Sequence, residues 1–376
     1  MKVVVAIDSF KGSMTSMEAR NGCKGRNLKS NTRMRMLSLK PLADGGEGTT
    51  DALIAGLGGE RIDLTVTGPL GTPVNAHYGY LAEKNTAILE MAAAAGIILV
   101  RESEKNPLTV TTYGVGEMIA DAMERGIRNF IIGIGGSATN DGGIGMLKAL
   151  GYQFSDENGQ DVGEGGQALE RVSSIIIEKA NPILKECSFH IACDVTNPLC
   201  GKNGATYIYG PQKGVTPEIA EELDQAMNHY ASVTSKFLHN DYASAEGAGA
   251  AGGLGFAFLS YLNATLTPGI DLILNAVELE KELEDTDITV TGEGRSITRP
   301  LWEKLLSVWQ DLQKNTAPKS LLLPEASPRQ QQPAMRPGID AFFPIVRGIT
   351  TLAEAMDPKN AKSNMAAAVE QVFRLL

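Results

Sequence analysis

Short runs of β-branched residues that end directly in glycine-rich or acidic loops constrain this chain most. Three such runs cover residues 3–7, 130–134 and 288–290, and each leads at once into glycines, acids and hydroxyl residues. In open α/β sheets, ligands bind outside the carboxyl ends of the strands, where such loops meet. Helical periodicity fills intervening stretches such as residues 116–125 and 218–237. The pattern predicts an α/β fold whose functional residues lie at strand ends.

The length of the chain favours two domains over the alternative of one large α/β unit, because 376 residues exceed what a single hydrophobic core usually serves. The apolar N-terminal strand and a late apolar run at residues 341–346 indicate that both chain ends pack in one sheet. We therefore expect a discontinuous α/β domain of residues 1–60 plus 285–376, and a second α/β domain of residues 61–284. One of them is expected to hold a Rossmann-like or flavodoxin-like parallel sheet.

Charge and hydropathy exclude several classes of protein. A net charge of −10 argues against a nucleic-acid surface, which needs a basic face to neutralise phosphates. The apolar stretch at residues 88–100 is too short to span a bilayer, and residues 247–262 are interrupted by five glycines. The first residues are typical of a buried strand and not of a signal peptide, so we expect a cytoplasmic protein with no membrane partner. The four histidines lie outside the loops discussed below, which disfavours a histidine-based site.

The most informative segment is GIGGSATNDGG at residues 133–143, between a predicted strand and a predicted helix. Glycines let the backbone approach an oxyanion closely and turn N–H groups toward it, and hydroxyl groups donate further hydrogen bonds. The segment is therefore predicted to bind a phosphate or a carboxylate, with a capped glycine turn as the structural alternative. The candidate anion-binding residues are Gly135, Gly136, Ser137, Thr139 and Asn140.

The same loop contains a variant of the dinucleotide fingerprint at residues 133–138, with Asp156 about 20 residues further on. A nicotinamide-dependent dehydrogenase of a hydroxy acid is thus a rival hypothesis, although Asp141 in the first turn of the helix would repel a pyrophosphate there. A second GxGxxG pattern at residues 247–252 follows no convincing strand and is either an anion-binding loop or a close-packing loop. No GxxxxGK[ST] pattern occurs, so a P-loop is excluded.

A second acidic glycine loop, DGGEGT at residues 44–49, places Asp44 and Glu47 three residues apart. Two such carboxylates repel one another unless a cation or a proton-transfer task uses them. Mg²⁺ is the natural cation, because it takes one or two carboxylates together with phosphate oxygens and water. We predict Asp44, Glu47 and Asp141 as metal ligands, with a solvated capping turn as the alternative for the 44–49 loop.

Further charged residues follow other predicted strands. Lys11 is expected to balance the transferring phosphoryl group, and Asp194 to take the proton of the substrate hydroxyl, so that Lys11, Asp44 and Asp194 are the catalytic candidates. Substrate- or phosphate-binding candidates in these loops are Ser9, Lys213 and Arg295; an arginine can clamp a carboxylate through two hydrogen bonds. Turns and structural ion pairs are the alternative explanation for each.

Seven motifs, taken in order, resemble the bacterial glycerate kinase family: DSFK, ADGGEGT, GGSATNDGG, CDVTNP, GPQKG, GAGAAGG and TGEGR. The resemblance covers most of residues 1–19, 41–297 and 338–376. It implies ATP-dependent phosphorylation of D-glycerate with Mg²⁺, at the 2-hydroxyl to give 2-phosphoglycerate, which enters glycolysis from glycolate or sugar-acid breakdown. It also implies two α/β domains with the active site in the cleft between them, and it allows a homodimer.

Residues 298–337 depart from that family pattern. They contain no glycine, six of the 17 prolines and both tryptophans, and residues 20–40 carry seven basic residues and no acidic one. One hypothesis is a short out-of-frame stretch. Another is a catalytically impaired glycerate-binding protein that lacks a strand and a site lysine in the 298–337 region.

Overall fold

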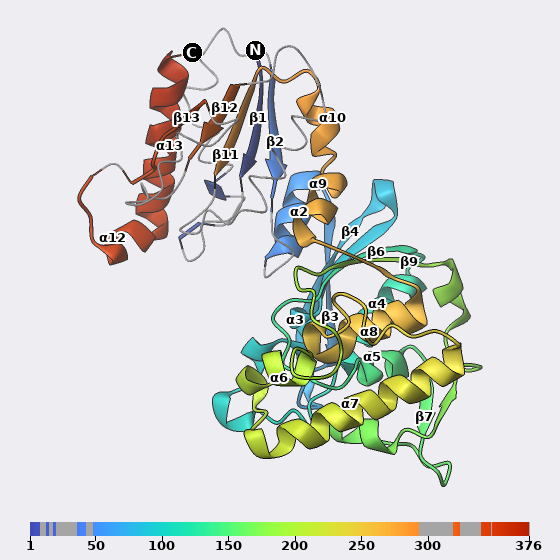
Figure 1. Cartoon of the computed structure of the whole chain (residues 1–376). Helices are drawn as coiled ribbons and strands as arrows, with labels where there is room; N and C mark the ends of the chain where they lie inside the picture. The colour runs from blue at the N-terminus through green and yellow to red at the C-terminus, as the bar shows by residue number, and fades with distance from the viewer. Residues whose placement is uncertain are drawn as a thin grey trace. The chain divides into compact units, whose positions relative to one another are not determined.

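The computed structural model describes residues 1–7, 13–14, 18–19, 36–42, 48–292, 319–323, 340–346 and 348–375. The chain divides into two compact units, each coloured by residue number in Figure 1. The first unit comprises Met1–Asp44, Asp51–Gly58 and Ile273–Leu376, and the second comprises Gly45–Thr50 and Gly59–Leu272. The domain boundaries expected from the sequence, and the expected place of the active site, stay predictions.

A parallel sheet with the strand order β13-β12-β11-β1-β2 forms the centre of the first unit. Its strands are β1 (Lys2–Ile7), β2 (Met36–Pro41), β11 (Ile288–Gly292), β12 (Lys319–Leu322) and β13 (Ala341–Phe342). The prediction that both chain ends share one sheet is confirmed. The expected loss of a strand within residues 298–337 is wrong, because β12 lies there and pairs with β11 and β13.

Apolar packing explains why the first unit holds together. The central strand β1 is buried from Val3 to Ile7 and lies between β11 and β2. The C-terminal helix α13 (Pro358–Leu375) contributes Met365 and Val369 to the same apolar cluster as Val3 and Val5. The two ends of the sequence therefore build one core.

The second unit contains a six-stranded sheet in the order β10-β9-β6-β5-β4-β3. Its strands are β3 (Glu60–Thr67), β4 (Pro73–Leu81), β5 (Thr86–Glu90), β6 (Asn129–Gly133), β9 (Ser188–Ala192) and β10 (Thr265–Thr267). From β5 to β10 the strands are parallel, whereas β4 pairs antiparallel with β3 and β5. A separate two-stranded ribbon joins β7 (Gln153–Ser155) to β8 (Ser174–Ile176).

Helices α4 (Tyr113–Glu124) and α7 (Pro217–Leu238) confirm the helical periodicity of residues 116–125 and 218–237. The remaining α-helices are α2 (Thr49–Leu57), α3 (Ala92–Ala95), α5 (Ile144–Ala149), α6 (Ala205–Tyr209), α8 (Ala250–Leu262), α9 (Gly269–Ala276), α10 (Leu279–Leu283) and α12 (Leu352–Met356). Short 3₁₀ helices are η1 (Ala82–Lys84), η2 (Ile97–Leu99), η3 (Glu102–Glu104), η4 (Gly166–Arg171), η5 (Pro182–Glu186) and η6 (Pro211–Lys213). Within the described residues, no helix has the length and apolarity needed to cross a membrane.

The core of the second unit fixes the strands that carry the candidate site. Phe130 of β6 stacks on Phe189 of β9 with ring centroids 4.9 Å apart. Helix α4 buries Val115, Met118 and Ile119, a helical spacing that turns one apolar face into the core. Strands β5, β6 and β9 are therefore held side by side, with their carboxyl ends at one edge.

Candidate functional site

Three neighbouring parallel strands end together at this edge of the second unit. Glu90, the last residue of β5, lies in register with Gly133 of β6, and Gly133 lies in register with Ala192 of β9. The loops that leave these strands therefore begin side by side. This is the location at which open α/β sheets bind their ligands.

The loop after β6 exposes two glycines and buries everything that follows them. Gly135 and Gly136 are exposed, whereas Ser137 is only 6% exposed and Thr139 is fully buried. Gly136 has φ +72°, a conformation that disfavours other residues, and its carbonyl accepts a hydrogen bond from the Ile97 N–H at 2.8 Å. The conformation of the exposed turn is therefore fixed, and its two glycines expose backbone atoms and no side chain.

Asp141 follows in the same loop and has no exposed surface. Its carboxylate accepts hydrogen bonds from the N–H and Oγ1 of Thr112, both at 2.8 Å, and from the N–H groups of Gly143 at 3.1 Å and Gly145 at 3.4 Å. Burial raises the pKa of this carboxyl, and the hydrogen bonds from Thr112 and Gly143 oppose the rise. The side chain thus ties the loop to the beginning of α5; its predicted role as a metal ligand stays a prediction.

Lys213 is the second buried charge under the loop. It is 2% exposed, and its Nζ donates a hydrogen bond to the Thr139 carbonyl at 2.7 Å. Burial lowers the pKa of Lys213 to about 7, while attraction to Asp141 acts in the opposite direction. The predicted anion-binding lysine is therefore anchored to the backbone of the glycine loop.

Two polar atoms in the same place have no hydrogen-bond partner among the residues that the structure describes. They are Thr139 Oγ1 and Asn140 Oδ1, on residues that are fully buried. The Asn140 amide nitrogen is satisfied, because it donates to Thr206 Oγ1 at 3.0 Å. Buried polar atoms without partners cost about 1–3 kcal/mol each, and a functional site is one of the places where a protein tolerates that cost.

A second glycine motif packs against the first. Ala251, Gly252 and Gly253 interrupt α8 with φ values of 52°, 68° and 90°, and the Gly252 carbonyl accepts a hydrogen bond from the Gly142 N–H at 2.9 Å. A Cβ atom on Gly252 would lie 2.1 Å from the Thr139 carbonyl oxygen. Of the two interpretations left open for residues 247–252, the contacts support close packing.

Asp194 lies two residues beyond the end of β9 and is exposed. Its Oδ1 accepts a hydrogen bond from the Gly269 N–H at 2.9 Å, at the beginning of α9.

Asp156, which the dinucleotide hypothesis needs, is held in a turn instead: its carboxylate accepts from the Gln160 N–H at 2.9 Å and from Arg171 at 3.0 Å. The nucleotide-binding role of Asp156 therefore has no support in these contacts.

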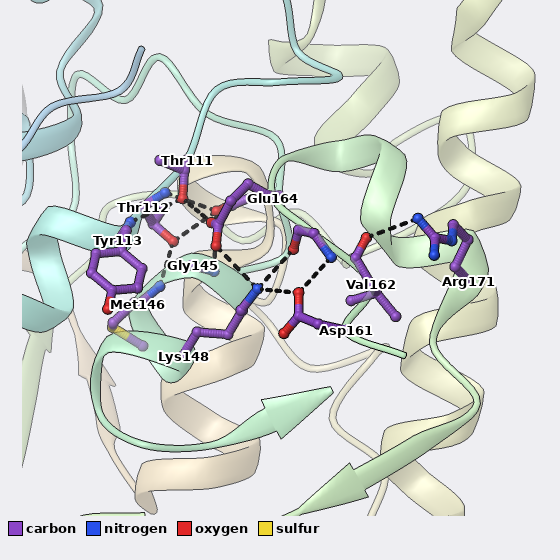
Figure 2. Close-up of polar contacts among 12 residues, drawn as sticks. Thr111, Thr112, Tyr113, Gly145, Met146, Lys148, Asp161, Val162, Glu164 and Arg171 are labelled. Carbon is purple, nitrogen blue, oxygen red and sulfur yellow. Dashed lines mark hydrogen bonds and ion pairs between the residues drawn. The ribbon is translucent and has the colours of Figure 1, made fainter. Parts of the chain in front are cut away.

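A more exposed ion-pair network is centred on Lys148 of α5 and is drawn together with Thr112 and Gly145 in Figure 2. Lys148 contacts Asp161 at 2.8 Å and Glu164 at 3.1 Å, and Glu164 also accepts a hydrogen bond from Thr111 Oγ1 at 2.7 Å. Burial alone would lower the pKa of Lys148, but the two acids outweigh it and raise the pKa. The network ties the 161–164 loop to α5 and to Thr111, the neighbour of Thr112.

Glu90 is a candidate that the sequence pattern missed. Its Oε1 accepts a hydrogen bond from the Thr50 N–H at 2.7 Å and its Oε2 from the Gly48 N–H at 3.1 Å. Burial raises the pKa of this carboxyl, while the bonds from Thr50 and Gly48 oppose the rise. An acidic residue at the end of an apolar strand is a signal that could have identified Glu90. It was missed because residues 88–100 form a predominantly apolar stretch.

The structure thus brings together four of the predicted site residues, namely Thr139, Asn140, Asp141 and Lys213. Five others lie outside the described residues: Ser9, Lys11, Asp44, Glu47 and Arg295. Among the described residues, no group of three or more histidines, cysteines, aspartates or glutamates could hold a metal ion.

Comparison with known proteins gives consistent matches. The model of the Glycerate kinase family matches residues 3–376. Glycerate 2-kinase of Escherichia coli K12 is 41% identical over 100% of this chain and 98% of its own length, and a glycerate kinase of Bacillus subtilis 168 is 42% identical over 95% and 93%. A crystal structure described as glycerate kinase 2 of Salmonella typhimurium LT2 has a TM-score of 0.88 at 38% identity, covering 100% of this chain and 98% of that one.

Proposed function

Because this chain belongs to the glycerate kinase family, we propose that it transfers the terminal phosphoryl group of ATP to the 2-hydroxyl of D-glycerate. That it is a kinase, and that it phosphorylates glycerate with ATP, follows from the family itself. The position of transfer is supported by the E. coli relative, which is named a glycerate 2-kinase. In the reaction, the hydroxyl oxygen bonds to the γ-phosphorus as the bond to the β,γ-bridging oxygen breaks, ADP leaves, and the hydroxyl proton passes to a base.

The observation that carries this proposal is the glycine loop at residues 135–143. Exposed Gly135 and Gly136 offer backbone alone to a ligand, while buried Lys213 and Asp141 fix the backbone beneath them. Preorganised donors stabilise developing negative charge without reorganising during the reaction. We assign this loop to an anionic oxygen of a substrate, either a phosphate of ATP or the glycerate carboxylate.

The roles proposed for the other groups rest on the sequence pattern alone. Asp194 is offered as the base that takes the hydroxyl proton, with Lys11 balancing the phosphoryl charge and Arg295 holding the carboxylate. Mg²⁺ with Asp44 and Glu47 belongs to the same set. The described residues alone do not fit a metal site, and the buried Asp141 carboxylate already accepts four hydrogen bonds.

The rival functions lose support. A nicotinamide-dependent dehydrogenase is not favoured by the family, and the acid that its fingerprint requires, Asp156, is held in its turn by Arg171. The hypothesis of an impaired glycerate-binding protein requires a lost strand in residues 298–337, and β12 is present there. We propose that the protein works in the cytoplasm, where ATP is available, that it feeds glycolysis from glycolate or sugar-acid breakdown, and that it forms a homodimer.

A coupled assay tests the proposed reaction. Purified full-length chain receives ATP, Mg²⁺ and D-glycerate, and the product is passed to enolase alone. Direct formation of phosphoenolpyruvate indicates 2-phosphoglycerate, as we expect, whereas a requirement for a mutase before enolase indicates the 3-isomer and overturns the proposed position. L-Glycerate serves as the stereochemical control, and the absence of D-glycerate-dependent ADP release contradicts the kinase assignment.

A further inference from the structure

Glu90 stands where two glycine-rich segments of the second unit meet. Its backbone is fixed to β6, because Glu90 lies in register with Gly133 and the Met91 N–H donates to the Gly133 carbonyl at 2.9 Å. Gly133 leads directly into the exposed glycine turn. The main chain of Glu90 is therefore tied to the strand that presents the anion-binding loop.

The side chain of Glu90 reaches a different segment. Its two carboxylate oxygens accept the N–H groups of Gly48 and Thr50, at 3.1 and 2.7 Å, where α2 begins. The first N–H groups of a helix have no acceptor within the helix, and a negative charge there is stabilising. Gly48 has φ +86°, so the backbone enters α2 through a turn that favours glycine.

Through these contacts the carboxylate of Glu90 caps the N-terminus of α2. The Glu90 carboxylate therefore occupies the N–H groups of Gly48 and Thr50, and it holds this end of the helix by its backbone. In sequence, Gly48 directly follows residues 44–47, which carry the acids that the proposed function assigns to metal and proton handling.

We propose that Glu90 is a positioning residue: it fixes Gly48 and Thr50 of the second unit to β5, the strand beside the one that carries the glycine loop, and turnover depends on that fixation. The inference rests on the proposed function, because it concerns the rate of glycerate phosphorylation. Because a positioning residue acts through the backbone groups that it holds, its loss is expected to lower kcat and leave both KM values nearly unchanged.

Glu90→Gln tests this directly. The amide keeps the shape of the side chain but offers one acceptor instead of two, and its NH₂ group faces a backbone N–H. We expect kcat to fall by about 10- to 100-fold, since small misplacements of reacting groups cost up to about 100-fold, with KM for ATP and D-glycerate within about threefold of wild type. Glu83→Gln, an exposed glutamate in η1 of the same unit, is the matched control and should retain wild-type kcat.

The outcomes separate this inference from the proposed function. No ADP release from the wild type removes the function itself. A folded Glu90→Gln enzyme within about twofold of wild-type kcat, or one that changes KM alone, overturns the positioning role. If a thermal melt shows Glu90→Gln unfolded at the assay temperature, Glu90→Asp decides: the shorter acid keeps the charge but not the reach, so a folded variant with lowered kcat supports the role and wild-type kcat overturns it.

Discussion

Two lysine–carboxylate clusters lie near the short helix α5 and differ in burial and in the groups that they bind. Beneath the glycine loop, Lys213 and Asp141 are 2% and 0% exposed and bind mainly to backbone groups. In the second cluster, Lys148 pairs with Asp161 and Glu164, whose side chains are 58% and 38% exposed. Only the first cluster places charge where solvent cannot screen it.

The difference in burial indicates different roles for the two clusters. Lys213 and Asp141 hold the backbone of the candidate site, whereas Lys148, Asp161 and Glu164 hold a surface loop. Burying an ionisable group is costly unless partners compensate, and proteins retain such groups most often where function needs them. Partly exposed pairs contribute about 0–1 kcal/mol and are common on ordinary surfaces. We therefore assign the loop architecture to Lys213 and Asp141, and a supporting role to the network of Figure 2.

Lys213→Met should give the largest effect. The substitution removes the hydrogen bond to the Thr139 carbonyl and leaves Asp141 without its nearby positive charge. We expect kcat/KM to fall by about 100-fold or more, because the loop loses its preorganised shape. Steady-state kinetics with ATP and D-glycerate, run beside circular dichroism to show that the variant is folded, provides the measurement. A folded variant with wild-type kcat/KM would break the comparison.

Gly252→Ala tests the packing of the two glycine motifs. At φ +68° an alanine costs about 1–3 kcal/mol in backbone strain, and its Cβ would also lie 2.1 Å from the Thr139 carbonyl oxygen. Gly126→Ala is the matched control, since Gly126 has φ +87° with no atom near the added Cβ. Chemical denaturation should show the larger loss of unfolding free energy, and an accompanying loss of turnover, for Gly252→Ala. Equal effects would mean that the close contact with the loop is unimportant.

The pH dependence of stability sharpens the contrast between the two lysines. The folded-state pKa of Lys213 is lowered to about 7, whereas an unfolded lysine keeps a proton up to about pH 10.4. Between these values the unfolded state binds more protons, so the free energy of unfolding should contain a term that rises with pH from about 7 to 10. Lys213→Met should lose this term in urea titrations across that window. Lys148, whose pKa is raised, contributes in the opposite direction.

Lys148→Met should give the smallest effect. It breaks two ion pairs that are partly exposed at their acidic ends, and we expect a loss of stability of about 1 kcal/mol or less with turnover within about twofold of wild type. A thermal melt and the kinase assay measure the two quantities. Raising the salt concentration should reduce the stability difference, because exposed pairs are screened. A loss of turnover comparable to that of Lys213→Met would erase the distinction.

How far the sequence could predict this architecture depends on whether the determinant is local. Glycines and acids at strand ends indicated the α/β fold and singled out Asp141 and Lys213, because strand-to-loop transitions are visible along the chain. Burial of Lys213 was not visible, since GPQKG is as compatible with a surface turn as with a buried one. The contacts of Gly252 with Thr139, and of Glu90 with Gly48 and Thr50, join segments that are far apart in sequence, so no spacing rule reports them.

The most direct test of the account is the rate of D-glycerate-dependent ADP release, measured side by side for the wild type, Lys148→Met and Lys213→Met. We predict that the wild type and Lys148→Met turn over within about twofold of each other, and that folded Lys213→Met is slower by about 100-fold or more. Equal rates for the two lysine variants would contradict the claim that the buried pair builds the anion-binding loop. No glycerate-dependent ADP release from the wild type would contradict the kinase assignment itself.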